Sequence, residues 1–186
     1  FRQKLMDEEP VFVGEFEAFV TQSYDKMYLV DDGYEPAPDQ SIAARARATG
    51  QTPQQIALDT LMAHAGEGML YFPLFNYSHG SLDVLESLHQ SEHTLMGLSD
   101  AGAHCGAICD GGMPTFMLTH WSRDRTRGER LPLEWMVHRQ TGQTAAAFGL
   151  NDRGLIRPGY RADVNVIDYE NLSLDRPRLS WDLPAG

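Results

Sequence analysis

Two short apolar runs on either side of an amphipathic segment constrain the fold of this 186-residue chain most strongly. Residues 69–72 are apolar at every position, and the mostly apolar run 94–98 ends just before Asp100. Short, continuous apolar runs are typical of strands that are covered on both faces, as in a parallel sheet. Between them, residues 81–88 combine a helix-capping serine with helical spacing of apolar residues. The order strand, helix, strand predicts an α/β fold built from βα units.

Helical patterns flank this unit on both sides. Ser41 can cap a helix that Gly50 ends, and Thr52 followed by Pro53 opens a second helix. The second helix carries an apolar stripe over residues 57–65, which we expect to lie on a larger core. On the C-terminal side, helices are predicted around residues 115–118, 131–140 and 141–148.

Beyond residue 150 the pattern changes from helical spacing to strand-like runs. Residues 154–156 and 162–168 are predicted strands, with Pro158 and Gly159 as the turn between them. The second run alternates apolar and polar residues, so one of its faces should be exposed to solvent. We therefore expect antiparallel sheet attached to the α/β body.

The charge balance excludes two classes of partner. Fifteen Lys and Arg stand against 26 Asp and Glu, giving a formal charge of -11, which argues against a nucleic-acid surface and against an anionic membrane surface. No apolar run approaches the roughly 20 residues that cross a bilayer. The two cysteines lie in one glycine-rich stretch and do not form a disulfide framework, which favours a reducing cytoplasm.

Asp100 is the first candidate for chemistry. A carboxylate just past the C-terminal end of a buried parallel strand lies where α/β barrels place catalytic groups. The small residues Ala101, Gly102 and Ala103 let a substrate or metal approach the backbone. A turn or helix-cap aspartate explains the same local sequence, and both interpretations remain open at this point.

Histidines and cysteines supply the other candidates. His104, Cys105 and Cys109 are possible zinc ligands, but a closed structural site needs four, so a local zinc site is not favoured. His89 and His93 have a zinc-binding spacing, but the glutamate of a zincin is missing and the helix should end there, so a structural role is preferred.

His120 lies in the run Leu-Thr-His-Trp-Ser-Arg-Asp. Its imidazole could contact a substrate or pair with Asp124. The sequence leaves these two alternatives open.

Four stretches then follow one another in a fixed order: Gly97–His104, Thr115–Asp124, Leu131–Leu150 and Gly154–Val164. The first resembles the final barrel-strand motif of the amidohydrolase superfamily, whose aspartate is close to the metal and catalytic. The second and third resemble segments of the N-acyl-D-amino-acid deacylases, and the fourth resembles the strand pair that re-enters their small β-sandwich. The resemblance covers roughly residues 65–175, and the ordered succession makes it specific.

For the fold, this resemblance implies the C-terminal part of a TIM-like (β/α)8 metallo-dependent hydrolase barrel. Residues 1–150 would belong to the barrel, with a lid-like insertion at about 17–75. Residues 151–186 would be an incomplete β-sandwich segment.

For the chemistry, the resemblance implies zinc-dependent hydrolysis of an amide, typically the N-acyl group of a D-amino acid. Asp100 would be both a metal-site residue and the catalytic base, taking a proton from metal-bound water and giving it to the leaving amine. Zinc can lower the pKa of bound water to about 7. His104 and His120 would contact the small-molecule substrate.

The family's remaining metal ligands should all precede Phe1, which has no initiator methionine before it. We therefore expect a fragment or processed product that alone binds no catalytic zinc and hydrolyses nothing. Its expected partner is the rest of the parent barrel, or another copy of itself, because a cut barrel leaves unpaired strand edges and apolar surface.

Two alternatives stay open. A cyclic-amide hydrolase resembling hydantoinases or dihydropyrimidinases would share the Asp100 strand end. A noncatalytic binding domain would instead be a stable monomer with a closed core.

Overall fold

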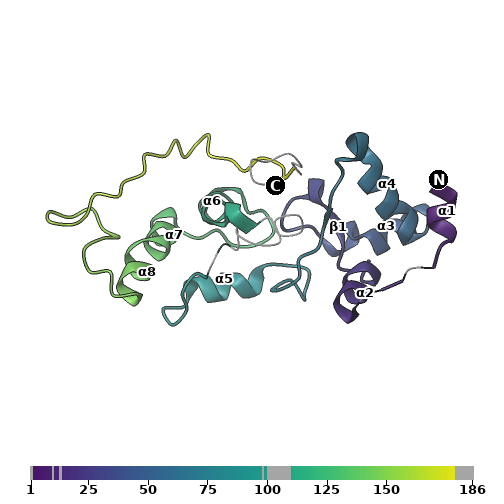
Figure 1. Ribbon diagram of the computed structural model, residues 1–186. Coiled ribbons are helices and arrows are strands. Elements are labelled where there is room, and N and C mark those ends of the chain that lie inside the picture. Colours follow the sequence, from purple (N-terminus) through teal and green to yellow (C-terminus); the bar gives the residue numbers. More distant parts are fainter. Residues whose placement is uncertain (1, 10, 13, 98, 100–109, 179–186) are drawn as a thin grey trace. The chain divides into compact units, whose positions relative to one another are not determined.

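The computed structural model describes residues 2–9, 11–12, 14–97, 99 and 110–178 (Figure 1). These residues form two compact units that divide between Leu82 and Asp83, with Arg178 belonging to the first unit. Each unit is described by itself below. The predicted boundary between the barrel and the β-sandwich segment near residue 150 is a different division, and it stays a prediction.

The first unit is mainly helical. Its described helices are α1 (Arg2–Asp7), α2 (Glu15–Gln22), α3 (Ile42–Thr49) and α4 (Pro53–Gly66), with 3-10 turns η1 (Val30–Asp32) and η2 (Pro38–Gln40).

The predicted ends of α3 and α4 are confirmed. The hydroxyl of Ser41 accepts a hydrogen bond from the N–H of Ala44 at 3.2 Å, and Gly50 ends the helix with φ 72°. The hydroxyl of Thr52 accepts from the N–H of Gln55, also at 3.2 Å. Each hydroxyl satisfies a backbone donor that the first helical turn leaves without a partner.

The apolar stripe of α4 is not covered within its own unit, and the larger core on which we expect it to lie stays a prediction. Leu61 is 44% exposed and Met62 is 60% exposed, so apolar surface of α4 faces outward within its unit.

One antiparallel strand pair completes the first unit. Strand β1 (Tyr28–Leu29) pairs with β2 (Leu70–Tyr71), with Tyr28 opposite Tyr71. The predicted strand at 69–72 is therefore present, but its partner is antiparallel rather than parallel. The core around it is formed by Met27, Tyr28, Ile42, Ala46, Tyr77 and Leu82.

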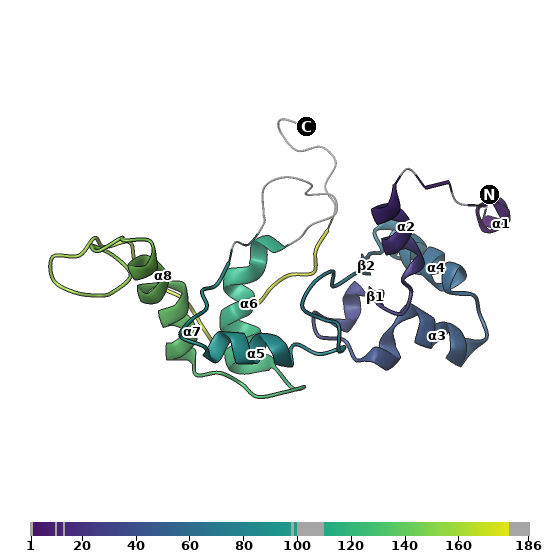
Figure 2. The same ribbon diagram turned by 90° about the horizontal axis from the view of Figure 1, so that it is seen from below.

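The regular elements of the second unit are all helical in the described residues. They are α5 (Asp83–Gln90), η3 (Asp110–Gly112), α6 (Met113–Thr119), the π-helical turn η4 (His120–Asp124), α7 (Leu133–Gln140) and α8 (Gly142–Ala147). Figure 2 shows α5 and α7 next to α6. Met117, Trp121, Leu131, Met136 and Ala145 form the apolar core, and Arg125 and Arg139 are buried among them.

Three predicted strands are not formed in the part of the chain that the structure describes. Residues 94–97, 154–156 and 162–168 belong to no β-ladder there. A strand needs a neighbouring backbone for its hydrogen bonds, and these segments have none among the described residues. The side chains of Ile156 and Val166 are 97% and 100% exposed. The parallel sheet predicted from the sequence is thus absent from the described structure.

Among the described residues, no helix is both long and apolar enough to cross a bilayer.

Candidate functional site

The structure describes only some of the predicted site residues. Asp100, His104, Cys105 and Cys109 lie outside the described residues, whereas His120 lies inside them. The structure therefore shows His120 and the helices that contact it.

His120 belongs to an aromatic cluster with Phe116, Trp121 and His89. Its ring stacks on Phe116, with centroids 4.5 Å apart and planes 11° apart, and meets Trp121 edge-on at 5.5 Å. The π-helical turn begins at His120, whose carbonyl accepts a hydrogen bond from the N–H of Arg125 at 2.8 Å. Such turns are rare in proteins overall, and those that occur are often found at functional sites.

Asp124, the alternative partner of His120, forms an ion pair with Arg123. Its two oxygens accept from Nε and Nη2 of Arg123 at 2.7 and 2.8 Å. This hydrogen bonding is the main cause of the lowered pKa of Asp124, and the charges of Arg123 and His120 contribute less. In the structure the ring of His120 thus packs against aromatic rings, and the carboxylate of Asp124 pairs with Arg123.

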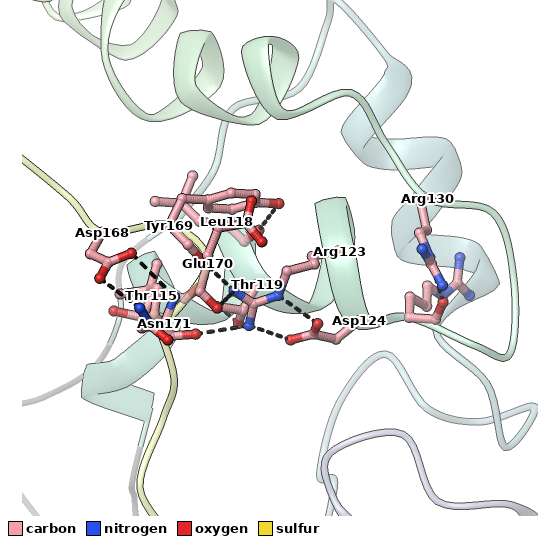
Figure 3. Close-up of polar contacts among 12 residues, drawn as sticks. Thr115, Leu118, Thr119, Arg123, Asp124, Arg130, Asp168, Tyr169, Glu170 and Asn171 are labelled. Carbon is pink, nitrogen blue, oxygen red and sulfur yellow. Dashed lines mark hydrogen bonds and ion pairs between the residues drawn. The ribbon is translucent and has the colours of Figure 1, made fainter.

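Arg123 also fixes the segment after residue 167 to the helices (Figure 3). Its Nη1 donates to the carbonyl of Tyr169 at 2.5 Å and its Nη2 to that of Leu172 at 2.8 Å. The guanidinium lies over the Tyr169 ring at 5.4 Å, and the Tyr169 hydroxyl donates to the carbonyl of Leu118 at 3.4 Å.

His89 closes the aromatic cluster from α5. Its ring lies 4.9 Å from that of Trp121. Burial is the main cause that lowers the pKa of His89 to about 4, and the charge of Arg139 contributes to the same shift. His89 is therefore neutral near pH 7. His93, at the spacing considered for zinc, lies beyond the end of α5 and is exposed.

A fully buried guanidinium connects α5 to η4. Arg125 forms ion pairs with Asp83 at 2.6 Å and Glu86 at 2.7 Å, both on α5. It also lies over the Trp121 ring at 4.7 Å. In the sequence this arginine belongs to a run rich in charged residues, which is usually a solvated surface, so sequence reasoning missed its buried role.

A second buried guanidinium connects α7 to the chain just before Asp100. Arg139, 1% exposed, donates to the carbonyls of Ser91 and Thr94, both at 2.9 Å, and to the Thr94 hydroxyl at 3.1 Å. Nearby, the indole N–H of Trp135 donates to the carbonyl of His89 at 2.8 Å. Sequence reasoning missed Arg139 too, because a polar residue on the face of a helix gives no sign of its burial.

The described residues do not form a metal site by themselves. No group of three or more His, Cys, Asp or Glu in the described part of the chain is placed to hold a metal ion. The metal-site residue proposed from the sequence, Asp100, lies outside that part.

Comparisons with known proteins agree with the resemblance. The N-acyl-D-aspartate deacylase of Alcaligenes xylosoxydans xylosoxydans is 43% identical over 56 residues, which cover 30% of this chain and 11% of that protein. The chain therefore matches only about a tenth of that relative's length. No solved structure matches. The model of the Amidohydrolase family matches residues 12–183, nearly the whole chain, and the chain therefore belongs to the amidohydrolase family.

Proposed function

We propose that this chain is part of a zinc-dependent amidohydrolase that removes the N-acyl group of a D-amino acid, with Asp100 as its acid–base residue. The observation that carries the proposal is the 43% identity to a relative named N-acyl-D-aspartate deacylase, inside a family match over residues 12–183. An acidic D-amino acid is accordingly the first substrate to test.

In this proposal Asp100 moves one proton during each turnover. Its carboxylate accepts a proton from the water that attacks the amide carbonyl carbon. It returns that proton to the nitrogen as the C–N bond breaks, so the products are a carboxylic acid and an amine, which become a carboxylate and an ammonium ion by proton exchange near neutral pH. His104 and His120 are proposed to contact the substrate.

Zinc remains a prediction from the family resemblance. Its ligands, apart from Asp100, are proposed to come from parts of the protein outside this chain. The described residues offer no alternative set.

The exposed apolar side chains support a larger fold around the chain. Ile156 and Val166 are almost completely exposed, and Met62 on α4 is 60% exposed. Large exposed apolar surface often marks a contact with another part of a protein. We propose that residues 1–150 complete a (β/α)8 barrel with the rest of the parent chain, with a lid at about 17–75, and that residues 151–186 join a small β-sandwich. A cytoplasmic location is part of the same proposal.

The test is a substrate panel for the complete protein. N-acetyl-D-aspartate, other N-acyl-D-amino acids, their L enantiomers and cyclic amides such as hydantoins are compared by amine release or ring opening. We expect hydrolysis of the D substrates, its loss on chelation and its return with added zinc. Preference for cyclic amides would favour the hydantoinase-like alternative, and no hydrolysis at all would favour a noncatalytic domain.

A further inference from the structure

We infer that the docking of residues 168–174 and the π-helical form of η4 are coupled through Arg123, so that release of this segment rearranges the aromatic cluster around Trp121. All of these residues belong to the second unit. The coupling depends on contacts within the chain and goes beyond the proposed reaction, which it does not require.

The guanidinium of Arg123 makes five hydrogen bonds, as many as it has N–H donors. Two go to the carboxylate oxygens of Asp124, at 2.7 and 2.8 Å. The other three go to the carbonyls of Tyr169, Glu170 and Leu172 (Figure 3). Because the guanidinium is a rigid fork, it holds the carboxylate on η4 and the three carbonyls in a fixed relation to one another.

The turn that binds Arg123 is held in shape by its own hydrogen bonds. The carboxylate of Asp168 accepts from the backbone N–H and the side-chain amide of Asn171, at 3.4 and 2.7 Å. The N–H of Leu172 donates to the carbonyl of Tyr169 at 3.3 Å. An aspartate that bonds to the backbone a few residues later is a common way to fix a turn. The three carbonyls therefore act on Arg123 as one unit.

The same segment also packs along α6. The hydroxyl of Tyr169 donates to the carbonyl of Leu118 at 3.4 Å. Leu174 lies against Gly112, where an added Cβ would come within 2.8 Å of the leucine side chain. Exposed and half-buried side chains alternate along residues 171–175, as in an extended segment with one covered face. The segment is thus docked on the helix that leads into η4.

The π-helical turn has an alternative form into which it can change. In η4 the N–H of Arg125 donates to the carbonyl of His120 at 2.8 Å. An α-helix would pair that carbonyl with the N–H of Asp124 instead. The π form has one more residue in the turn, and it is rare. Return to α-helical pairing would tighten the turn and rotate Trp121 and Arg123 about the helix axis.

These two forms are what the contacts of Arg123 distinguish. Its bonds to the carbonyls of residues 169–172 are made in the π form, so the docked segment favours that form. The π form in turn places the ring of Trp121, which meets the rings of His89 and His120 at 4.9 and 5.5 Å. Coupling between two parts of a protein needs an element with two discrete arrangements, and η4 is that element.

A purely local role of Arg123 makes a different prediction. The N–H of Leu131 donates to the carbonyl of Trp121 at 2.7 Å, and Arg125 is paired with Asp83 and Glu86 on α5. If these contacts alone hold the π form, loss of Arg123 should release residues 168–174 and leave η4 unchanged.

The experiment compares Arg123→Gln, Arg123→Lys and Tyr169→Ala with the control Arg153→Gln in the complete protein. Arg153 is the matched control because it too is paired with the neighbouring aspartate, Asp152, at 3.0 Å. The exposed fractions of the two arginine side chains are also similar, 33% for Arg153 and 26% for Arg123.

Two readouts report separately on the segment and on η4. Hydrogen exchange is measured for peptides that cover residues 118–126 and 168–174. Fluorine NMR of protein labelled with 5-fluorotryptophan reports on the surroundings of Trp121, whose signal is assigned with Trp121→Phe.

For Arg123→Gln we expect exchange to accelerate about tenfold or more in both peptides, because hydrogen bonds of a charged group are lost from both elements. The signal of Trp121 should shift or split. Arg123→Lys keeps the charge without the fork, so it should give an intermediate result, and it keeps the test possible if Arg123→Gln does not fold.

Tyr169→Ala tests the coupling from the other side. It changes no residue of η4, yet it should accelerate exchange in residues 118–126, since coupling between two parts is reciprocal. Arg153→Gln should leave both peptides and the Trp121 signal within about twofold of wild type or unshifted, because it is remote from these contacts.

Two results would overturn the inference. One is an Arg123→Gln variant with faster exchange in residues 168–174 alone and an unshifted Trp121 signal. The other is a Tyr169→Ala variant that releases the segment while exchange in η4 stays at the wild-type rate. Either result would mean that Arg123 attaches the segment without controlling the form of η4.

Discussion

The helices of residues 113–147 and the segment of residues 150–168 differ in two respects. They differ in how many backbone hydrogen bonds form within the chain and in how far their apolar side chains are buried. In the first region, α6, η4, α7 and α8 surround a core that contains Trp121 and Met136, both fully buried. In the second, the predicted strands form no ladder among the described residues, and Ile156 and Val166 are exposed.

The difference follows from where the two kinds of element find their partners. A helix makes its backbone hydrogen bonds within itself, so a local sequence pattern is enough to form it. A strand makes its backbone hydrogen bonds with another strand. An equally clear strand pattern in the sequence therefore forms no sheet until a partner strand is present. The proposed parent barrel and sandwich would supply those partners.

The largest effect on this comparison should come from Trp121→Ala. Trp121 is fully buried and contacts His89, His120 and Arg125. Its removal should lower the free energy of unfolding by about 3–5 kcal/mol, because a cavity replaces the ring. Urea unfolding of the complete protein measures this. A loss below about 1 kcal/mol would contradict the described core.

A smaller effect is expected from His89 and pH. The pKa of His89 in the folded protein is about 4, below its value of about 6.5 in an unfolded chain. The unfolded state therefore binds the proton first as pH falls, and the stability that neutral His89 contributes above pH 6.5 is lost between about pH 6.5 and 4.

From pH 7 to pH 5 this loss should stay below about 2 kcal/mol, because the ring is only partly buried and solvent screening weakens the effect. His89→Gln should remove that part of the pH dependence, while Trp135 keeps its hydrogen bond to the backbone carbonyl of residue 89. Unfolding curves at both pH values give the comparison. Equal pH dependence in wild type and variant would show that His89 titrates normally.

The smallest effects should come from substitutions in the C-terminal segment, compared between this chain and the complete protein. In this chain Ile156 is 97% exposed, so Ile156→Ser should change stability by less than about 0.5 kcal/mol. In the complete protein it should cost about 1.5 kcal/mol, if the proposed sandwich covers the side chain. Arg157→Ser, in the neighbouring turn, serves as the control. An equal change in stability in this chain and in the complete protein would mean that the side chain of Ile156 is not buried in the complete protein.

Helix ends were the most predictable part of the fold. Ser41, Gly50 and Thr52 cap their helices as expected. These signals depend on a few neighbouring residues, which the sequence contains in full.

Tertiary partners were not predictable in the same way. Arg125 and Arg139 looked like surface charges, and only the fold shows that each is buried against carboxylates or carbonyls. The antiparallel pairing of β2 with β1 depends on residues about 40 positions apart. Of the candidate site, His120 is placed in an aromatic cluster, while Asp100 and His104 lie outside the described residues and their roles stay predictions.

The central claim, that Asp100 carries the proton in amide hydrolysis, is tested most directly by kcat of the complete protein with Asp100→Asn, measured on N-acetyl-D-aspartate beside the control Asp152→Asn. Asp152 is an exposed carboxylate paired with Arg153. We expect Asp100→Asn to lower kcat about a hundred- to ten-thousandfold, the range of general acid–base catalysis, while Asp152→Asn leaves it unchanged. A folded Asp100→Asn variant with wild-type kcat would contradict the claim.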